Sequence, residues 1–446
     1  MLKRKIDNFL IEWKKKADKK PLIVKGARQV GKTTSIRHFA QQHYKHVVEI
    51  NFALQRQYHG IFENGFEVDT IIRNITLVNP QLVIETGKTL FFFDELQACP
   101  DCTTSLKSFK QDGRYDVICS GSLMGVHYHQ IESNSVGYKE DIVMHSMDFE
   151  EFLWACGYDD GLSEDLFAHM IETSPLSTLM MSRLTELFRQ YMVLGGMPEV
   201  VNTFVTQKHY GGTMSLQRQL LLDYEEDITK YAVGFEKAKV LAIYRHISTF
   251  LAQENKRFQV TKITPSARNR QYLGAVEWLD NAGIVNVCYC LHELALPLKG
   301  NYDPKRYKVY YRDTGLLIAS LDEEAQEDLR SNQNFATYKG AIYENIVADM
   351  LVKQGYSLFY YRNDKASIEM DFFVRSANHL WPVEVKASNT ASASLNKLTS
   401  QTSCRAKTDI QYGIKLCGSN IGFNGKFYTF PYFLTYLLKR WLREQG

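Results

Sequence analysis

The sequence predicts a multidomain α/β protein whose first part is built on a parallel sheet. Two patterns predict it: from residue 21 short apolar runs alternate with helical segments, and towards the C-terminus strands again follow a helix. Short strands that are apolar throughout are typical of a parallel sheet covered by helices. The expected strands of the first part span residues 22–24, 47–52, 90–93, 117–119 and 142–144.

Length and composition agree with several folded domains. At about 150 residues per domain the 446 residues suggest three domains. The 45% hydrophobic and 23% charged residues exclude a disordered, collagenous or coiled-coil chain. The pattern divides the chain into four segments. We expect a first domain with an N-terminal helix over 1–150, a helical connector over 151–235, a winged-helix-like domain over 236–330 and a C-terminal α/β domain over 331–446.

Charge and cysteine content restrict the function classes. The net charge is only +3, so any basic, nucleic-acid-binding surface must be local. Eight cysteines scattered through a chain without a secretory leader predict reduced thiols and a cytoplasmic protein. Cys99 and Cys102 form a C-x-x-C pair, but no second pair completes a zinc site, so we expect no metal there. Asp7 and Glu12 argue against a signal peptide, and no apolar run approaches the ~18 residues of a membrane span.

The first expected element is an amphipathic helix with lysines on and beyond its polar face. Its apolar residues at helical spacing are Ile6, Phe9, Leu10, Trp13 and Ala17. The apolar stripe is short, so packing on the following domain is favoured over a membrane anchor.

Helices are expected from about residue 149 to 232, with a break at Gly195-Gly196-Met197-Pro198. Two further helices and two strands then follow in the order of a winged helix, over 237–253, 267–281, 284–291 and 308–311. The polar stretch 323–334 is expected to mark a boundary. The last segment is expected to contain one helix and three strands, over 339–353, 357–361, 370–374 and 380–385.

Residues 26–33 match G-x-x-x-x-G-K-[ST] between an apolar strand and a helix, the context of a phosphate-binding P-loop. Its backbone N–H groups would surround a β-phosphate at the positive end of the helix. Lys32 would neutralise the β- and γ-phosphates, and Thr33 would place its hydroxyl on Mg²⁺. The expected nucleotide-binding residues are Gly26, Ala27, Arg28, Gln29, Val30, Gly31, Lys32, Thr33 and Thr34.

A second motif, Walker B-like, ends the expected strand 90–93. Asp94 would hold the Mg²⁺ shell, and Glu95 would be the base for the attacking water or would orient it. Ser120, at the end of the next strand, would sense the γ-phosphate or position water, and a plain turn serine is the alternative. With Lys32, these are the expected catalytic residues of ATP hydrolysis. Arg114 is the best candidate for an arginine acting in trans, although a surface role is favoured.

In combination these motifs resemble a known family. The segments G-A-R-Q-V-G-K-T-T, F-F-F-D-E-L-Q, S-G-S-L, D-F-E-E-F-L at 148–153 and G-G-M-P-E-V-V at 195–201 resemble the prokaryotic AAA-family ATPases whose C-terminal half is a domain of unknown function. The resemblance covers nearly the whole chain. It implies a P-loop NTPase core that binds ATP, a helical connector, a winged helix and a C-terminal domain of restriction-endonuclease-like PD-(D/E)XK fold. Residues 137–139 carry no Arg where many members would have one, which puts an arginine finger there in doubt.

The last segment carries acids in a nuclease-like order. Period-2 alternation places Glu384 and Lys386 on one face of the strand that follows Asp371. This matches the D…E-x-K order in which two carboxylates bind Mg²⁺ and the lysine orients or activates the water that attacks a phosphodiester. Asp371, Glu384 and Lys386 are therefore candidate catalytic residues, and Glu344 would complete the metal's oxygen shell. The alternative is a fold retained as a docking or nucleic-acid-binding module.

The winged-helix-like segment has a local basic patch that suits phosphate and groove contacts. Its residues are Lys256, Arg257, Arg268, Asn269, Arg270 and Tyr272. Winged helices also dock proteins, so both readings stay open.

The sequence thus predicts an ATP-binding and ATP-hydrolysing protein with ATP and Mg²⁺ as cofactors. Its C-terminal nuclease-like domain would bind or cleave nucleic acid, with DNA favoured. The alternative is a nucleotide-gated protein-interaction switch with an inactive nuclease-like docking domain. Nucleic acid or a protein is the expected partner, and no membrane partner is expected. The sequence does not define a homo-oligomeric state.

Overall fold

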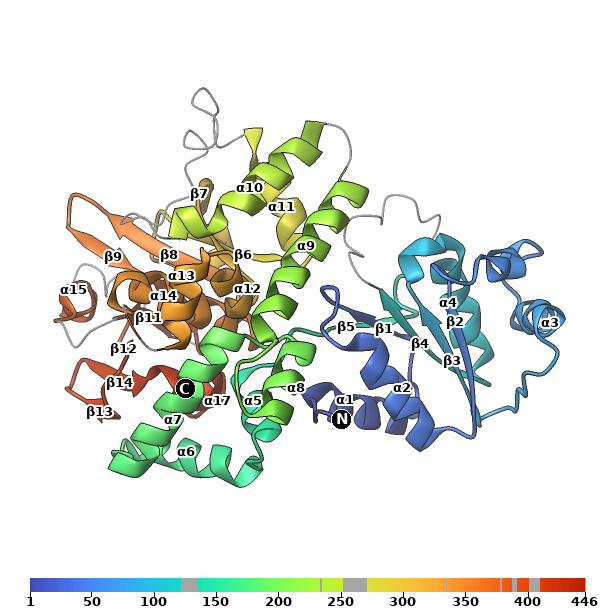
Figure 1. The fold of residues 1–446 in the computed structure, drawn as a ribbon, viewed down its shortest axis with the longest axis horizontal. Coiled ribbons are helices and arrows are strands. Elements are labelled where there is room, and N and C mark those ends of the chain that lie inside the picture. Colours follow the sequence, from blue (N-terminus) through green and yellow to red (C-terminus); the bar gives the residue numbers. More distant parts are fainter. Residues whose placement is uncertain are drawn as a thin grey trace. The chain divides into compact units, whose positions relative to one another are not determined.

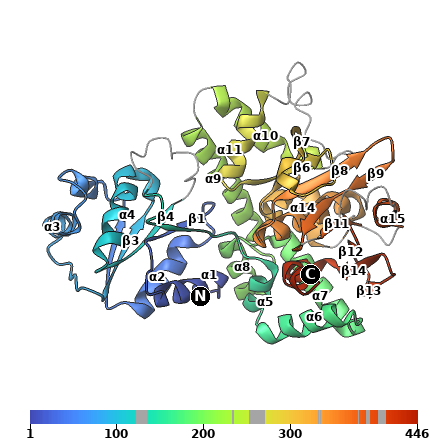
Figure 2. The same ribbon diagram turned by 180° about the vertical axis from the view of Figure 1, so that it is seen from behind.

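The computed structural model describes residues 1–121, 135–232, 235–251, 271–331, 333, 335–377, 379–386, 391–400 and 410–445. They form two compact units. The first unit comprises Met1–Ser146 with Asn281–Gly283, and the second comprises Met147–Asp280 with Ile284–Gly446. The elements of each unit can be followed in Figure 1 and, from behind, in Figure 2.

The first unit is built on a five-stranded, wholly parallel sheet with the order β2-β3-β4-β1-β5. Its strands are β1 (Leu22–Lys25), β2 (His46–Asn51), β3 (Thr89–Asp94), β4 (Asp116–Gly121) and β5 (Glu140–Val143). All five expected strands are confirmed, and the central strand β3 is buried at every residue, as its apolar run predicts. The carboxyl ends of the strands share one edge, and the loops that follow them meet there.

Helices cover both faces of this sheet (Figure 1). One face is covered by α3 (Val68–Val78) and α4 (Pro100–Asp112), which pack on the phenylalanines of β3. The other face is covered by α1 (Lys5–Lys15) and α2 (Lys32–His43), and Leu10 and Trp13 of α1 are buried as expected. The short 3-10 helices of this unit are η1 (Arg56–Phe62) and η2 (Leu96–Ala98).

The second unit begins with the helical segment that the sequence predicts. Its helices are α5 (Phe149–Ala155), α6 (Asp160–Glu172), α7 (Thr178–Leu194), α8 (Pro198–Gln207), α9 (Thr213–Tyr231) and α10 (Phe235–Leu251). The break between α7 and α8 has a steric cause. Gly195 has a φ of 71°, in the left-handed region, and a Cβ on Gly196 would lie 1.9 Å from the Met147 carbonyl oxygen. The two glycines therefore let the start of this unit pass close against the turn.

The two strands of the winged-helix-like segment belong to a larger sheet of order β7-β6-β8-β9. Its strands are β6 (Val285–Leu291), β7 (Tyr302–Tyr311), β8 (Leu358–Asn363) and β9 (Ile368–Met370), and α11 (Leu273–Asn281) precedes them. Because β6 pairs antiparallel with β7 and parallel with β8, this sheet does not divide at residue 331. The helix, helix, two-strand order is present, but its assignment as a winged helix stays a prediction.

The polar stretch 323–334 contains the helix α13 (Glu323–Arg330), and Asp322 caps it by accepting a hydrogen bond from the Ala325 amide. That this stretch marks a domain boundary stays a prediction. One local expectation for the second unit needs correction. The expected strand 370–374 is two strands in different sheets: β9 ends at Met370, and β10 (Phe372–Arg375) begins after Asp371. Asp371 thus lies at the crossing from one sheet to the other.

The last sheet is mixed and has the order β10-β11-β12-β14-β13. Its further strands are β11 (Leu380–Val385), β12 (Gly413–Cys417), β13 (Gly422–Phe423) and β14 (Phe427–Pro431). Strands β11, β12 and β14 are parallel, so their carboxyl ends share an edge. The described part of the unit also contains the helices α12 (Thr314–Ala319), η6 (Leu298–Gly300), α14 (Phe335–Lys353), α15 (Ala393–Ser400), η7 (Tyr432–Leu437) and α17 (Leu438–Glu444).

All seven cysteines within the described ranges are free. No helix in the described part of the chain combines the length and the apolar character needed to cross a membrane.

The contact at Gly196 yields a stability prediction. Gly196→Ala would place a methyl group against the Met147 carbonyl, so we expect it to lower the free energy of unfolding of the second unit by about 3 kcal/mol. Chemical denaturation followed by tryptophan fluorescence measures this. Gly418→Ala is the matched control, because nothing lies within 4 Å of its added Cβ. Equal stability of the two variants would contradict the steric account.

Candidate functional site

The P-loop lies between the end of β1 and the start of α2. Gly31 precedes α2 with a φ of 97°, a conformation that favours glycine, and Gln29 is also left-handed, with a φ of 62°. A Cβ on Gly26 would lie 2.2 Å from the Met144 carbonyl oxygen. The loop geometry therefore depends on both glycines of the motif, and the loop leads directly into the N-terminus of α2, where phosphates bind favourably.

The side chain of Lys32 is folded into this loop. It is 7% exposed, and its Nζ donates to the carbonyl oxygens of Gly26, at 3.1 Å, and Ala27, at 2.7 Å. Burial lowers the pKa of Lys32 to about 8, although Glu95 and Asp94 oppose this shift. A poorly solvated ammonium at a helix N-terminus is suited to a polyphosphate, which would replace the carbonyl contacts with stronger charge-assisted ones.

Asp94 is the hub of the site. This buried carboxylate at the end of β3 accepts hydrogen bonds from the Thr33 hydroxyl at 3.2 Å, from the Asn51 amide at 3.2 Å and from the Ser120 hydroxyl. Side chains from α2, β2, β3 and β4 thus meet at one edge of the sheet. Thr33 and Asp94 together form an oxygen pair of the kind that Mg²⁺ binds.

Glu95 lies next to this hub in an unusual backbone conformation. Its φ is 55°, which is rare for a residue other than glycine and is typical of functional sites. Its amide donates to Asp94 Oδ1 at 3.0 Å, and its carboxylate accepts a hydrogen bond from Gln97. The conformation is thus held by bonds on both the backbone and the side chain of Glu95.

The structure brings together most of the nucleotide-site residues expected from the sequence. Among the remaining loop residues, Ala27 and Val30 are buried, while Arg28, Gln29 and Thr34 are exposed. Arg114 is different, since it precedes β4 at the opposite edge of the sheet and pairs with Asp112 and Asp69. These two ion pairs are typical of a surface arginine, the role that the sequence favours for Arg114.

Asn51 is a site residue that the sequence analysis missed. Its signal is a polar side chain ending a strand beside the Walker B-like strand, which pattern alone does not distinguish from a turn residue. Asn51 Oδ1 also accepts from the amides of Ala53 and Leu54, at 3.1 and 3.0 Å, which fixes its orientation towards Asp94.

A second group of predicted residues meets in the second unit. Phe372 pairs with Val383 at one end of the antiparallel ladder. Asp371 and Glu384 are the next residues beyond this pair, Asp371 preceding Phe372 and Glu384 following Val383 in the chain. Asp371 accepts a hydrogen bond from the Val385 amide at 2.8 Å, and Lys386 Nζ lies 3.0 Å from Glu384 Oε1. Glu384 is 3% exposed. The expected D…E-x-K arrangement is therefore formed.

Glu344 has different partners. It is buried and lies 2.9 Å from Lys308 Nζ, and the Tyr310 hydroxyl donates to it. Burial works against the charge of Lys308, but the carboxylates of Glu344 and Asp371 raise the pKa of Lys308 above its ordinary value. Lys308 was missed by the sequence analysis, although a lysine at the start of an apolar strand is a weak signal. The Lys308 ammonium is therefore the cation that neutralises the Glu344 carboxylate.

Over the described ranges, no group of three or more His, Cys, Asp or Glu side chains is placed to hold a metal ion together. A divalent ion in the second unit would therefore depend on Asp371 and Glu384, with water completing its shell. Glu384 Oε2 suits this role, because it is buried and no donor among the described residues reaches it.

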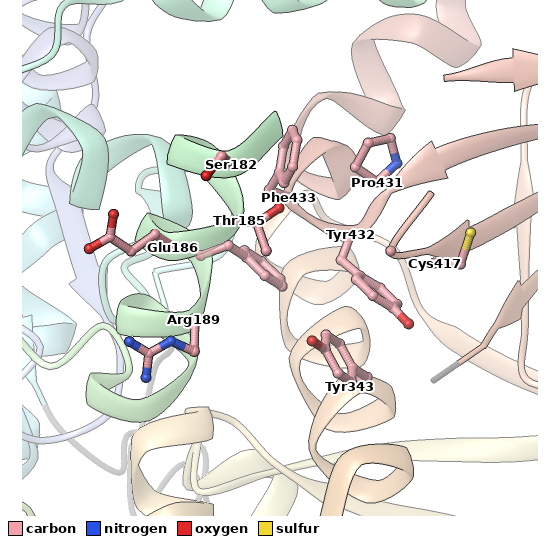
Figure 3. A pocket seen from close by; sticks show the side chains of 11 residues that line it. Ser182, Thr185, Glu186, Arg189, Tyr343, Cys417, Pro431, Tyr432 and Phe433 are labelled. Atoms are coloured by element: carbon pink, nitrogen blue, oxygen red, sulfur yellow. The ribbon is translucent and has the colours of Figure 1, made fainter. Parts of the chain in front are cut away.

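The second unit also contains a cavity of about 580 Å³ (Figure 3). Arg189 and Glu186 of α7 line one side of it, and Tyr343 and Tyr432 line another. The two tyrosine rings stack with centroids 4.0 Å apart, and the Tyr432 hydroxyl donates to the Lys386 carbonyl oxygen. Tyr343 is also the neighbour of Glu344 in the chain. The Tyr432 hydroxyl is thus the link from this cavity to the backbone of Lys386.

The basic patch of the winged-helix-like segment is largely outside the described residues. Lys256, Arg257, Arg268, Asn269 and Arg270 all fall there. Tyr272 is described and is 8% exposed, so its ring packs inside the unit rather than facing a groove.

Three family models match parts of the chain. A family described as an AAA domain matches residues 18–153. Two families described as domains of unknown function, DUF8612 and DUF4143, match residues 185–327 and 339–433. With the parallel sheet and the P-loop, the first match identifies an AAA-type P-loop ATPase-like domain in the first unit. The restriction-endonuclease-like assignment of the C-terminal part stays a prediction.

Solved structures with some similarity include the Walker-type ATPase PABY2304 of Pyrococcus abyssi, at 14% identity and a TM-score of 0.43, covering 72% of this chain and 96% of that one. The Aeropyrum pernix Orc1 protein in complex with DNA is 13% identical with a TM-score of 0.28, covering 75% and 92%. AMPPCP-bound DnaA from Aquifex aeolicus is 13% identical with a TM-score of 0.28, covering 60% and 81%. The comparison with curated proteins gave no match.

The environment of Lys32 makes a pH dependence testable. With a pKa of about 8 in the nucleotide-free protein, Lys32 loses its charge above pH 8, whereas an ordinary lysine keeps its charge to about pH 10. Because the charged form binds phosphate, the affinity for ATP should fall by up to about tenfold per pH unit above pH 8. Titration with a fluorescent ATP analogue from pH 7 to 9.5 measures this. Lys32→Arg, which stays charged, should flatten the profile. A flat wild-type profile would contradict the prediction.

Proposed function

We propose that the first unit binds ATP with Mg²⁺ and hydrolyses it. The observation that carries this proposal is the meeting of Thr33, Ser120 and Glu95 at the buried Asp94 carboxylate, beside a complete P-loop. Phosphoryl transfer needs positioning and charge stabilisation more than covalent chemistry, and this arrangement is suited to supply both.

Each residue then has a distinct role. Thr33 and Asp94 would hold Mg²⁺, which would supply neutralisation of charge on the β- and γ-phosphates. Lys32 and the loop N–H groups bind the phosphates, and Glu95 accepts a proton from the attacking water or orients it. Ser120 donates to Asp94, so we assign it the orientation of that carboxylate in addition to its expected role of sensing the γ-phosphate or positioning water.

Two variants separate binding from turnover. Lys32→Ala should weaken ATP binding about 100-fold, because it removes the buried cation. Glu95→Gln should retain ATP binding and lower the turnover rate ~100-fold, because the base is lost. Equilibrium binding and steady-state hydrolysis measure both effects. Lys107→Ala, an exposed lysine on α4, is the charge-matched control. Unchanged ATP affinity in the Lys32 variant would refute the assignment.

For the second unit we propose a metal-dependent, nuclease-like site that binds or cleaves nucleic acid, with DNA favoured. The supporting observations are the hydrogen bond from the Val385 amide, next to Glu384 in the chain, to Asp371, the distance of 3.0 Å between Lys386 and Glu384, and an unpartnered, buried Glu384 Oε2 within the described part. Two adjacent carboxylates repel unless a cation offsets them. A divalent ion at Asp371 and Glu384 would satisfy that oxygen and place a phosphate near Lys386.

Cleavage and binding assays test the nuclease-like site. In the presence of Mg²⁺ or Mn²⁺, Asp371→Asn and Lys386→Met should each lower cleavage of single- or double-stranded DNA or RNA by ~1,000-fold or more. ATP hydrolysis should not change. Lys426→Met, an exposed lysine of the same unit, is the control. If the wild-type protein shows neither cleavage nor salt-sensitive nucleic-acid binding, with or without ATP, the nucleotide-gated docking module is the better account.

A further inference from the structure

Arg4 is the starting point, because it joins the P-loop to another segment although it lies before residue 18, where the AAA-domain match begins. Its side chain is 5% exposed. One terminal nitrogen donates to the Val30 carbonyl oxygen in the P-loop at 2.8 Å, and the other donates to the His145 carbonyl oxygen at 2.8 Å. The planar guanidinium fork thus holds two backbone segments that are far apart in the sequence at a fixed spacing.

The segment that contains His145 also contacts the P-loop directly. The Met144 amide donates to the Lys25 carbonyl oxygen at 2.7 Å. A Cβ added to Gly26 would lie only 2.2 Å from the Met144 carbonyl oxygen, so no side chain fits between them. This segment leaves the first unit at Ser146, so we call residues 144–146 the exit segment. The exit segment therefore cannot shift without disturbing the phosphate-binding loop.

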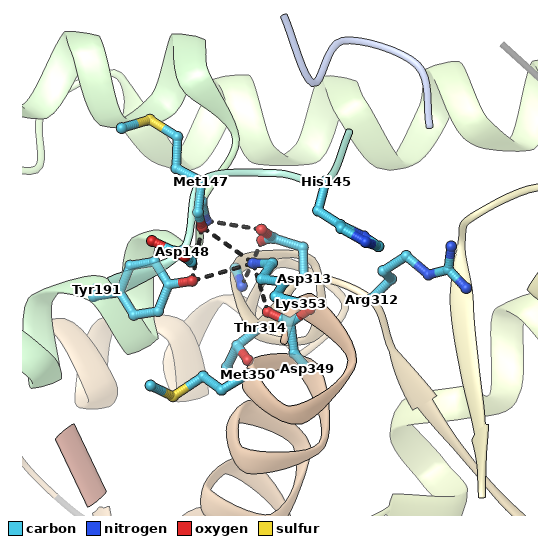
Figure 4. Close-up of polar contacts among 12 residues, drawn as sticks. His145, Met147, Asp148, Tyr191, Arg312, Asp313, Thr314, Asp349, Met350 and Lys353 are labelled. Carbon is cyan, nitrogen blue, oxygen red and sulfur yellow. Dashed lines mark hydrogen bonds and ion pairs between the residues drawn. The ribbon is translucent and has the colours of Figure 1, made fainter. Parts of the chain in front are cut away.

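The next residue, Met147, is held tightly within the second unit (Figure 4). Its amide donates to the Gly196 carbonyl oxygen at 2.7 Å. Its carbonyl oxygen accepts from the Tyr191 hydroxyl at 2.8 Å and from Lys353 Nζ at 3.1 Å. A Cβ on Gly196 would lie 1.9 Å from that oxygen. We call these contacts the Met147 anchor.

Buried charged side chains surround the Met147 anchor and make it costly to displace. Lys353 is 3% exposed and lies 2.7 Å from Asp349, one helical turn away on α14. Asp313 accepts from the Gly196 amide at 2.7 Å and from the Gly315 amide at 3.0 Å. Displacing Met147 would therefore remove partners from buried polar groups, which is costly. Figure 4 shows these side chains converging on the start of the second unit.

We propose that Arg4 is a positioning residue of the nucleotide site that links the state of the P-loop to the second unit through the exit segment and the Met147 anchor. The proposal rests on ATP binding as proposed above. From Met144 to Met147 the chain spans at most about 10 Å, so a shift of the loop on phosphate binding has little slack to absorb it. The proposed path follows the backbone to Met147, whose amide donates to the Gly196 carbonyl in the turn between α7 and α8.

Hydrogen exchange of the full chain, with and without Mg²⁺ and a non-hydrolysable ATP analogue, tests the link. Protection of residues 26–34 reports nucleotide binding. Protection of residues 147–153 and 191–197 reports that the effect of nucleotide binding reaches the second unit. In the wild type we expect nucleotide to slow exchange in all three regions, by about threefold or more in the last two. Arg4→Gln should keep the protection of residues 26–34 and lose the change in the last two regions.

Further variants exclude a purely structural role for Arg4. Arg4→Lys keeps the charge but not the fork, and it should restore part of the transmission. Arg37→Gln, an exposed arginine on α2 that pairs with Glu49, should behave as the wild type. For Arg4→Gln the KM for ATP should rise more than kcat falls.

The outcomes are distinguishable. Nucleotide protection confined to the first unit of the wild-type protein would overturn the link even if Arg4→Gln failed to fold. Full transmission in a folded Arg4→Gln variant would overturn the role of Arg4. If residues 26–34 themselves gained no protection, ATP binding would be refuted, and this inference with it.

Discussion

The nucleotide site depends on one carboxylate. Asp94 accepts hydrogen bonds from Thr33, Asn51 and Ser120, and its neighbour Glu95 donates its amide to the same group. These residues come from separate strands and a helix, and only the parallel sheet brings their ends to one edge. The buried position of Asp94 strengthens each of these bonds, because the local dielectric is low. A change at Asp94 would therefore disturb residues on every element of the site.

Much of this site could be predicted from the sequence, because its signals are local. A strand, a glycine-containing loop and a helix follow one another within a few residues of Lys32, and Asp94 and Glu95 directly end an apolar strand. Arg4 and Asn51 could not be predicted in this way. Arg4 reaches the P-loop from 26 residues before Val30, and nothing near it in the sequence marks that contact. The left-handed conformation of Glu95 likewise results from tertiary contacts.

The second unit was less predictable because its decisive contacts are long-range. Apolar patterns located β6, β8 and β11, but they do not encode that β6 pairs with β8 across the expected domain boundary. The continuous pattern over 370–374 hid the change of sheet at Asp371. Lys308 and Glu344 are 36 residues apart, and their mutual neutralisation is visible only when the strand and the helix are packed together. The Gly195–Gly196 turn could be located, but its reason, the close approach of Met147, required the structure.

The most direct test of the central claim is steady-state ATP hydrolysis by the full chain as a function of Mg²⁺ concentration, compared with Asp94→Asn. The account predicts no turnover in excess chelator, a saturable rise with Mg²⁺ in the wild type, and a loss of that rise in the variant while ATP still binds. Turnover that is unaffected by chelation, or an unchanged Mg²⁺ response in Asp94→Asn, would contradict it.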